Sequence, residues 1–402
     1  MDPVLNPYAP TAGWPPPEFA GRDDLIETAD IAMRRILAGR QANSIVMRGL
    51  RGVGKTVVLK HLQPKASALG FETLDLEVPD AAGGHLLTRL VPQLSATLIR
   101  LSRRKRAEAY VKRAQAAFQN LVSVFSIKYE GISVGVDPAT PEASTGQLDI
   151  DLPELLGLIA EAAKADGRGI AIFIDEIQYL SKEELSALSL TAHDLGQRQL
   201  PFLLIGCGLP QIAAAMADAK SYAERLFDFP ELGPLDPVAA RRVLAIPAKS
   251  EGVEFTDDAL DSIVEKTRAY PYFLQTWGKF CWDLAEHSPI TAEDVETAGP
   301  EILAHLDRNF FRVRYDRCSN AERQYLRGLA ELGPGEHASG RVAQVLGTTS
   351  DKISRIRAGL IDIGMVYSPE YGMTAFTVPK FDAFMRRVMP ELAPYKPQRG
   401  VK

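Results

Sequence analysis

The sequence predicts an α/β domain, a parallel sheet with helices on both faces, followed by an all-α segment and a winged helix-turn-helix domain. Short apolar runs at 44–47, 71–76, 170–174 and 201–205 alternate with segments of helical periodicity, which is typical of a buried parallel sheet. The strand signal stops near 236, where several helices are expected. From about 316 the pattern is helix, helix, basic helix and hairpin, the order of a winged helix.

The composition is that of a folded globular protein. Its 402 residues are 46% hydrophobic and 24% charged, and this length predicts two or three domains. No stretch approaches the roughly 18 to 20 uncharged apolar residues of a membrane span, and the first residues carry no export signal, so we expect a cytoplasmic protein without membrane contact. Cys207, Cys281 and Cys318 lie far apart and are expected in the core, and the six scattered histidines argue against a metal cluster.

The chain begins with a proline-rich segment. Six of its 27 prolines lie in the first 17 residues, which is incompatible with a helix or a central strand and predicts an extended arm. The expected parts are an arm at 1–22, the α/β domain at 23–235, a helical segment with a linker at 236–315, the winged helix at 316–392 and a tail at 393–402.

The α/β domain contains an insertion at about 100–150. The run 100–113 holds seven basic residues and one acidic residue, and we interpret it as a solvated helix face, with a polyanion contact as the alternative. The alternating residues 127–136, around Glu130-Gly131, predict a β-hairpin.

A phosphate-binding loop is predicted directly after the first strand. The residues Gly49-Leu50-Arg51-Gly52-Val53-Gly54-Lys55-Thr56 satisfy the pattern G-x-x-x-x-G-K-T and precede a helical run. Glycines allow successive backbone N–H groups to point at phosphate oxygens, Lys55 can reach the β and γ phosphates, and the Thr56 hydroxyl can bind Mg²⁺. The sequence therefore predicts a nucleoside triphosphate site.

The third apolar strand ends in two adjacent carboxylates, Asp175 and Glu176. Asp175 is expected to hold Mg²⁺, usually through a water, and Glu176 to orient and activate the attacking water. A charged strand end that simply meets solvent is the alternative, but a phosphate loop on a neighbouring strand favours the catalytic interpretation.

These motifs resemble those of the AAA+ ATPases, on the side that includes origin-recognition (Orc/Cdc6-like) proteins and STAND switch ATPases. GLRGVGKT and FIDE are preceded by an AGRDDL box at 20–25. The resemblance implies an ATP and Mg²⁺ site between the α/β domain and a helical lid, with Gly21 and Arg22 near the base or ribose. It also implies an oligomer in which Arg225 is an arginine finger for a neighbouring subunit. A surface arginine paired with Asp228 or Glu224 is the alternative for Arg225.

Two positions depart from the family pattern. Gly206-Cys207-Gly208 offers no strong donor where relatives carry a polar sensor, and the lid has only Arg268 and Lys279 near its expected arginine. The segment Tyr270-Pro271 resembles the His-Pro or Tyr-Pro segment of STAND-like lids, in which Pro271 would sense the nucleotide by packing. Hydrolysis is therefore expected to be slow or stimulated by a partner.

The C-terminal segment suggests contact with DNA. Residues 310–402 carry 15 basic and 9 acidic side chains, although the whole chain has a net charge of -5. The third predicted helix of this domain would place Ile353, Ile356, Leu360 and Ile361 inside and Lys352, Ser354, Arg355 and Arg357 outside, facing a duplex. A winged helix used for protein contact or oligomer packing is the alternative.

Two functional hypotheses follow. The first is an oligomeric ATPase that binds or remodels double-stranded DNA, with Lys55, Glu176 and Arg225 as catalytic residues. The second is a STAND-type signalling switch with little turnover, in which nucleotide occupancy sets a conformation that a protein partner recognises.

Overall fold

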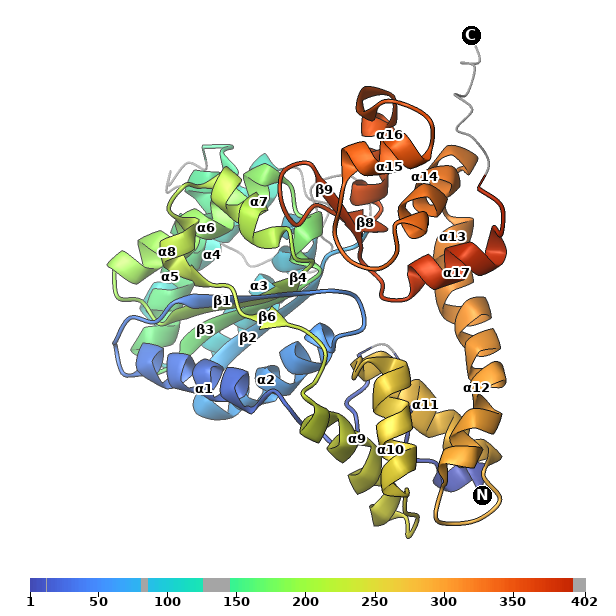
Figure 1. Ribbon diagram of the computed structural model, residues 1–402. Coiled ribbons are helices and arrows are strands. Elements are labelled where there is room, and N and C mark those ends of the chain that lie inside the picture. The colour runs from blue at the N-terminus through green and yellow to red at the C-terminus, as the bar shows by residue number, and fades with distance from the viewer. Residues whose placement is uncertain (12, 81–85, 126–144, 393–402) are drawn as a thin grey trace.

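The computed structural model describes residues 1–11, 13–80, 86–125 and 145–392 (Figure 1). In it an α/β domain, a helical segment and a C-terminal domain follow one another along the chain. The predicted hairpin at 127–136 and the tail at 393–402 lie outside the described residues.

The central sheet is parallel, as predicted. Its strand order is β2-β3-β4-β1-β5, and β6 pairs with β1. The strands are β1 (Ser44–Gly49), β2 (Phe71–Glu77), β3 (Gly169–Asp175), β4 (Phe202–Gly208), β5 (Phe227–Asp228) and β6 (Glu231–Leu232). The central strands β3 and β4 are buried along their whole length, which is why they are near-continuous apolar runs.

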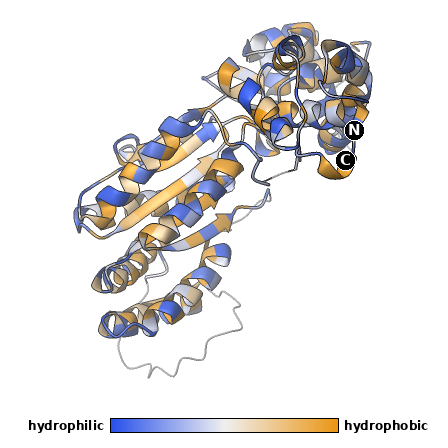
Figure 2. Cartoon of the chain, turned by 90° about the horizontal axis from the view of Figure 1, so that it is seen from below, coloured by the Kyte–Doolittle hydropathy of each residue, from blue (hydrophilic) through white to orange (hydrophobic). Residues whose placement is uncertain are grey.

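Helices cover both faces of the sheet (Figure 2). Ile45 and Met47 of β1 pack into one hydrophobic core and Val46 into the other, because successive side chains of a strand point to opposite faces. One face carries α1 (Asp23–Leu37) and α2 (Lys55–Leu69). The other carries α3 (Leu86–Ser102), α4 (Glu108–Val124), α5 (Leu148–Ala165) and α6 (Lys182–Gln197), with α7 (Ile212–Ala219) and the short α8 (Ala223–Leu226) beside them. The predicted fold class is confirmed for this part of the chain.

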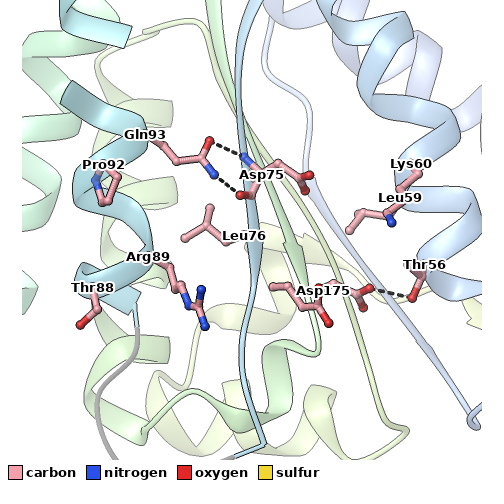
Figure 3. A pocket seen from close by; sticks show the side chains of 11 residues that line it. Thr56, Leu59, Lys60, Asp75, Leu76, Thr88, Arg89, Pro92, Gln93 and Asp175 are labelled. Atoms are coloured by element: carbon pink, nitrogen blue, oxygen red, sulfur yellow. Dashed lines mark hydrogen bonds between the residues drawn. The ribbon is translucent and has the colours of Figure 1, made fainter. Parts of the chain in front are cut away.

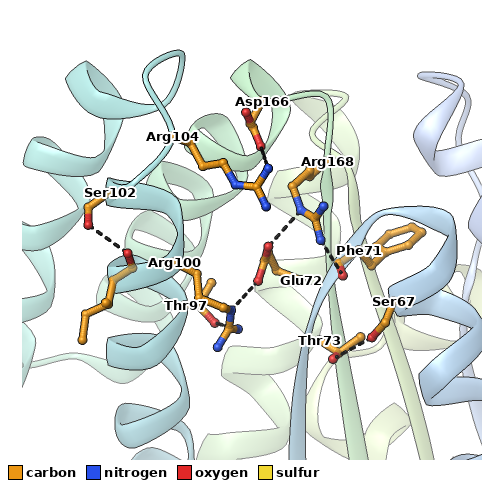
Figure 4. A network of polar contacts seen from close by, with 11 residues as sticks. Ser67, Phe71, Glu72, Thr73, Thr97, Arg100, Ser102, Arg104, Asp166 and Arg168 are labelled. Atoms are coloured by element: carbon orange, nitrogen blue, oxygen red, sulfur yellow. Dashed lines mark hydrogen bonds and ion pairs between the residues drawn. The ribbon is translucent and has the colours of Figure 1, made fainter.

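Part of the basic run 100–113 is neutralised inside the domain. Glu72, which is buried on β2, forms ion pairs with Arg100 at 2.7 Å and Arg168 at 2.8 Å, and Arg104 pairs with Asp166 at 3.4 Å (Figure 4). These contacts join the end of α3 to β2 and to the start of β3. Residues 103–107 form the connection between α3 and α4, so the run is not the single helix face of the interpretation.

The N-terminal arm packs against the helical segment. This segment consists of α9 (Pro237–Ser250), α10 (Asp257–Thr267), α11 (Pro271–Leu284) and α12 (Ala292–Leu306). Tyr8 is buried with its ring against Gly278, and its hydroxyl donates to the Leu244 carbonyl. The Trp282 indole N–H donates to the carbonyl of Asp2 at 2.9 Å, beside the short helix η1 (Pro3–Leu5). The arm is therefore part of the core of the helical segment.

The C-terminal domain has the predicted order of three helices and a hairpin. The chain enters it from α12 through η3 (Asp307–Phe311) and α13 (Arg312–Asp316), as Figure 1 shows. The helices are α14 (Asn320–Glu331), α15 (Ser339–Val345) and α16 (Ser350–Asp362). The sheet order is β7-β9-β8, antiparallel, with β7 (His337–Ala338), β8 (Val366–Tyr367) and β9 (Met373–Phe376). The sequence analysis predicted neither β7 nor the last helix, α17 (Phe381–Val388).

Other expectations from composition can be compared with the fold. All three cysteines are buried and unbridged. Within the ranges that the structure describes, no helix has the length and apolar character needed to cross a bilayer.

Candidate functional site

The predicted phosphate loop joins β1 to α2 in the geometry that the motif requires. Gly52 and Gly54 have φ of 85° and 93°, a left-handed conformation that side-chain-bearing residues rarely adopt. The Lys55 ammonium donates to the carbonyls of Gly49 at 2.9 Å and Leu50 at 3.0 Å. Burial lowers the pKa of Lys55, and the charges of Glu176 and Asp175 oppose that shift. The loop thus holds a buried cation at the N-terminus of a helix, where anions bind.

The acidic pair at the end of β3 lies beside this loop, as predicted. The Thr56 hydroxyl donates to Asp175 Oδ2 at 2.6 Å (Figure 3). The other carboxylate oxygen accepts the Glu176 backbone N–H at 2.8 Å and the Cys207 thiol at 3.0 Å. Burial raises the pKa of Cys207 well above its usual value, so this thiol keeps its proton and can donate. Cys207, at the position where the sequence offered no strong donor, therefore holds Asp175 in place.

Glu176 is fixed by a residue that the sequence analysis did not identify. Its backbone is left-handed, with φ of 54°, a strained conformation for a residue with a side chain. Gln178 donates from its amide nitrogen to Glu176 Oε2, and its amide oxygen accepts the backbone N–H of Leu209 at 3.0 Å. Gln178 thereby connects the carboxylate to the chain that leaves β4.

A cavity of about 440 Å³ lies over the phosphate loop. The arm contributes apolar lining, including Trp14 and Phe19. The loop contributes residues 51–56, and Glu176 lines the cavity directly after β3. Arg22 also lines the cavity and donates to the carbonyls of Val53 at 3.2 Å and Gly233 at 2.6 Å. Burial lowers the pKa of Arg22, and Asp236 opposes that shift.

Gly21, which was expected beside the nucleotide together with Arg22, has a different position. Gly21 does not line this cavity. A side chain at Gly21 would meet Ala239 and Leu235, so the glycine permits close packing between the arm and the start of the helical segment.

Two tyrosines join the helical segment to the phosphate loop. Tyr270 donates from its hydroxyl to the carbonyl of Arg51, and the backbone N–H of Tyr272 donates to the carbonyl of Gly52 at 3.2 Å. Pro271 lies between them at the first turn of α11 and lines the cavity. The helical segment therefore contacts the loop on either side of the proline that the resemblance pointed to.

The C-terminal domain also reaches the loop. The backbone N–H of Arg51 donates to the carbonyl of Thr377 at 3.2 Å, and its guanidinium donates to the Tyr179 hydroxyl at 2.5 Å. Gly364 lies so close that an added side chain would meet the same guanidinium at 2.8 Å. Arg51 is thus in contact with both the α/β domain and the C-terminal domain.

Two further cavity residues were missing from the prediction. Arg314, on α13, lines the cavity together with residues of the phosphate loop. The side-chain oxygen of Gln275, on α11, is buried there without a hydrogen-bond partner among the described residues. No sequence motif marks either residue, because both are brought to the loop only by the packing of the helical segment.

Arg225 lies near the end of β1 that is opposite the phosphate loop. Phe227, two residues later, pairs with Ser44 at the start of β1, whereas the phosphate loop follows the end of β1 at Gly49. Arg225 is exposed and does not line the cavity. The structure therefore places it away from the nucleotide site of its own chain, and a role toward a neighbouring subunit stays a prediction.

The four residues predicted to face DNA divide into two groups. Lys352, Ser354 and Arg355 are exposed on α16. The expectation that Arg357 lies on the same outer face is wrong. Its guanidinium donates to the Thr374 hydroxyl at 2.6 Å and to the Met373 carbonyl at 2.7 Å, so it fastens α16 to the hairpin. At its position in the helix the side chain points back toward the domain, where three acceptors converge.

The donor set fits Mg²⁺. A hydroxyl and a carboxylate, from Thr56 and Asp175, are the oxygen ligands that this ion takes in phosphate-loop sites, where the nucleotide and water supply the rest. Among the residues that the structure covers, no cluster of three or more histidine, cysteine or acidic side chains could hold a metal by itself.

Comparisons with known proteins agree with this geometry. Residues 18–205 match the AAA ATPase domain family, and residues 308–385 match a domain of unknown function (DUF8462). No curated protein matches the sequence. The Walker-type ATPase PABY2304 of Pyrococcus abyssi is similar in fold, with a TM-score of 0.52 and 14% identity over 91% of this chain and 95% of that chain.

Two other solved structures match with lower scores. The RuvB Holliday junction branch migration motor of Thermotoga maritima gives a TM-score of 0.44 and 16% identity over 97% of this chain and 99% of that chain. The Orc1 protein of Aeropyrum pernix in complex with DNA gives a TM-score of 0.44 and 16% identity over 92% of this chain and 94% of that chain.

Proposed function

Because residues 18–205 form an AAA+ P-loop ATPase domain, we propose that this protein binds and hydrolyses ATP, assembles as an oligomer and binds or remodels DNA. The observation that carries the ATPase proposal is the contact between Thr56 of the phosphate loop and Asp175 of β3. It joins the two motifs that a triphosphate and its metal require, although 119 residues separate them in the sequence.

Each residue of the site has a chemical role in this proposal. Lys55 and the loop N–H groups bind the β and γ phosphates, and Thr56 and Asp175 would hold Mg²⁺, which neutralises phosphate charge when bound. Glu176 accepts a proton from the attacking water as the new bond to the γ phosphorus forms and the bond to the β,γ-bridging oxygen breaks. Gln178 keeps the Glu176 carboxylate oriented for that transfer.

In this proposal a neighbouring subunit of the oligomer supplies a further positive charge to the site, the arginine finger. An arginine finger stabilises the negative charge on the transferring phosphoryl group and accelerates hydrolysis about 10³- to 10⁵-fold. Arg225 is exposed near the end of β1 that is opposite its own loop. At this position it could contact the nucleotide of a neighbouring subunit.

The DNA contact in this proposal rests on α16. Lys352 and Arg355 are exposed there, and they would meet phosphates or guanine edges of a duplex. Because Arg357 is engaged within its own domain, only a few phosphates would be contacted and the salt dependence of binding would be modest.

A specific observation favours a second function, the STAND-type switch. Arg51 of the phosphate loop donates through its backbone to Thr377 of the C-terminal domain, and Tyr270 of the helical segment donates to the same loop residue. A nucleotide that moves the loop would change both contacts, and a protein partner could recognise the resulting position of the C-terminal domain.

Steady-state hydrolysis and ATP binding test the proposed function together. Glu176→Gln should retain ATP binding and lose about 10²- to 10⁴-fold in hydrolysis rate, because it removes the general base. The matched control is Glu183→Gln, an exposed carboxylate at the start of α6 that should leave both unchanged.

One outcome tests the catalytic assignment of Glu176, and two more separate the ATPase from the switch. Equal turnover by the wild type and Glu176→Gln would remove the catalytic assignment. Stimulation of wild-type hydrolysis by stoichiometric duplex DNA supports the first function. A single slow turnover with retained nucleotide and no response to DNA supports the switch.

A further inference from the structure

We propose that Arg314 binds the γ phosphate of ATP within its own chain, and this inference rests on the proposed function. Arg314 lies on α13, the short helix between the helical segment and the C-terminal domain. Such a contact would come from neither the phosphate loop nor a neighbouring subunit.

The position of Arg314 supports this role. Its side chain is half-buried and lines the same cavity as Lys55 and Glu176, the two residues that the proposed function assigns to the γ phosphate and its attacking water. One guanidinium nitrogen donates to the carbonyl of Phe310 at 2.5 Å, and the group lies 4.3 Å from the centre of the Phe310 ring. The ring and the carbonyl hold one side of the guanidinium, so its direction is set before a ligand binds.

The charges around Arg314 indicate an anionic ligand. Neighbouring arginines are paired, Arg312 with Asp316 at 3.0 Å and Arg317 with Asp80 at 2.6 Å. Among the described residues, no carboxylate pairs with Arg314. The charged side chain with the largest effect on the pKa of Arg314 is another cation, Arg51, which lowers it.

The proximity of two cations has an electrostatic cost. Burial, and then the charge of Arg51, lower the pKa of Arg314 to about 10, so it remains protonated at neutral pH. Two like charges on the wall of one cavity repel each other, and a polyphosphate between them would relieve that repulsion. The second cation belongs to the phosphate loop itself, which places the proposed contact at the phosphates and away from the apolar arm.

The contact would discriminate between ATP and ADP. Because α13 leads directly into the C-terminal domain, a bond from Arg314 to the γ phosphate would tie the position of that domain to the presence of the third phosphate. Loss of the γ phosphate would leave Arg314 and Arg51 facing each other again.

Calorimetric titration of the full-length protein with ATP and with ADP, each with Mg²⁺, tests the inference. Arg314→Ala should weaken ATP binding about 10-fold or more, as expected for a charged hydrogen bond, and change ADP binding less than about 2-fold. Arg314→Lys should recover part of the ATP affinity. The matched control is Arg312→Ala on the same helix, whose side chain is exposed and paired with Asp316, and it should bind both nucleotides as the wild type does.

The outcomes separate this inference from the proposed function. If the wild type binds ATP, and Arg314→Ala binds both nucleotides normally or weakens both equally, the inference is overturned and the ATPase proposal stands. If the wild type binds neither nucleotide, both fail. Should Arg314→Ala not fold by circular dichroism, Arg314→Gln keeps the stem that packs on Phe310 and decides the same comparison.

Discussion

Gln178 shows how a single uncharged residue can hold a carboxylate, here Glu176, for which we propose the role of general base. Its amide oxygen is held by the Leu209 backbone, and its amide nitrogen in turn holds Glu176. The space around it is tight, since a side chain at Gly208 would approach the Gln178 amide oxygen within 2.7 Å. The position of the Glu176 carboxylate therefore depends on the chain that follows β4.

We predict that Gln178→Leu lowers kcat for ATP hydrolysis roughly 10-fold while KM changes less than about 2-fold, because a positioning contact is lost and the phosphate contacts remain. Steady-state kinetics measure this, with Gln197→Leu, an exposed glutamine at the end of α6, as the control. A rise in KM with unchanged kcat would show that Gln178 serves substrate binding instead.

At the scale of residues, the sequence predicted what is local. Lys55 and Thr56 follow from one motif, and Asp175 and Glu176 from the end of one apolar strand, because both patterns are contiguous. Arg314 and Gln178 could not be predicted, since their contacts depend on tertiary packing.

The prediction that Arg357 faces outward was wrong for a similar reason. Helical spacing gives only the approximate direction of a side chain. It does not show that Ser368, Met373 and Thr374 of the hairpin offer acceptors to this guanidinium.

At the scale of elements, the arm is the clearest departure from expectation. Proline content predicts an extended chain without helix, but residues 3–5 form the short helix η1, and the arm is bound to the helical segment. The ring of Tyr8 is 3% exposed, and its hydroxyl, which donates to Leu244, would be unsatisfied without that partner.

Removing this contact should destabilise the helical segment. We expect Tyr8→Phe to lower the free energy of unfolding by about 1 kcal/mol, and Tyr8→Ala by about 3 to 5 kcal/mol, because the second change also empties a buried site. Denaturant unfolding followed by tryptophan fluorescence reports on it, since Trp282 contacts the arm. Tyr371→Ala, at a fully exposed tyrosine, is the control. Equal stability of Tyr8→Ala and the wild type would mean that the arm is not part of this core.

The elements that were predicted well are those with strong burial patterns. The strands β3 and β4 are buried throughout, so composition alone marks them. The two-residue strand β7 and the eight-residue helix α17 are short, and their formation depends on the partners β9 and α14.

At the scale of the whole molecule, three parts of the chain meet at the phosphate loop. The helical segment reaches it through Tyr270 and Tyr272, the C-terminal domain through Thr377, and the arm through the lining of the cavity. A ligand at this loop would therefore bear on the arrangement of every part (Figure 1). The order of the parts could be predicted from the sequence, but their convergence could not, because it involves contacts between residues more than 200 positions apart.

The central claim is that the loop around Lys55 binds the phosphates of ATP. Calorimetric titration of ATP with Mg²⁺ into the wild type, Lys55→Ala and the control Lys65→Ala, an exposed lysine on the same helix, tests it most directly. We predict saturable binding by the wild type and Lys65→Ala, and a loss of about 10-fold or more in affinity for Lys55→Ala, since a buried ammonium is removed from the phosphates. Equal ATP affinity of all three proteins, or no binding by any of them, would contradict the account.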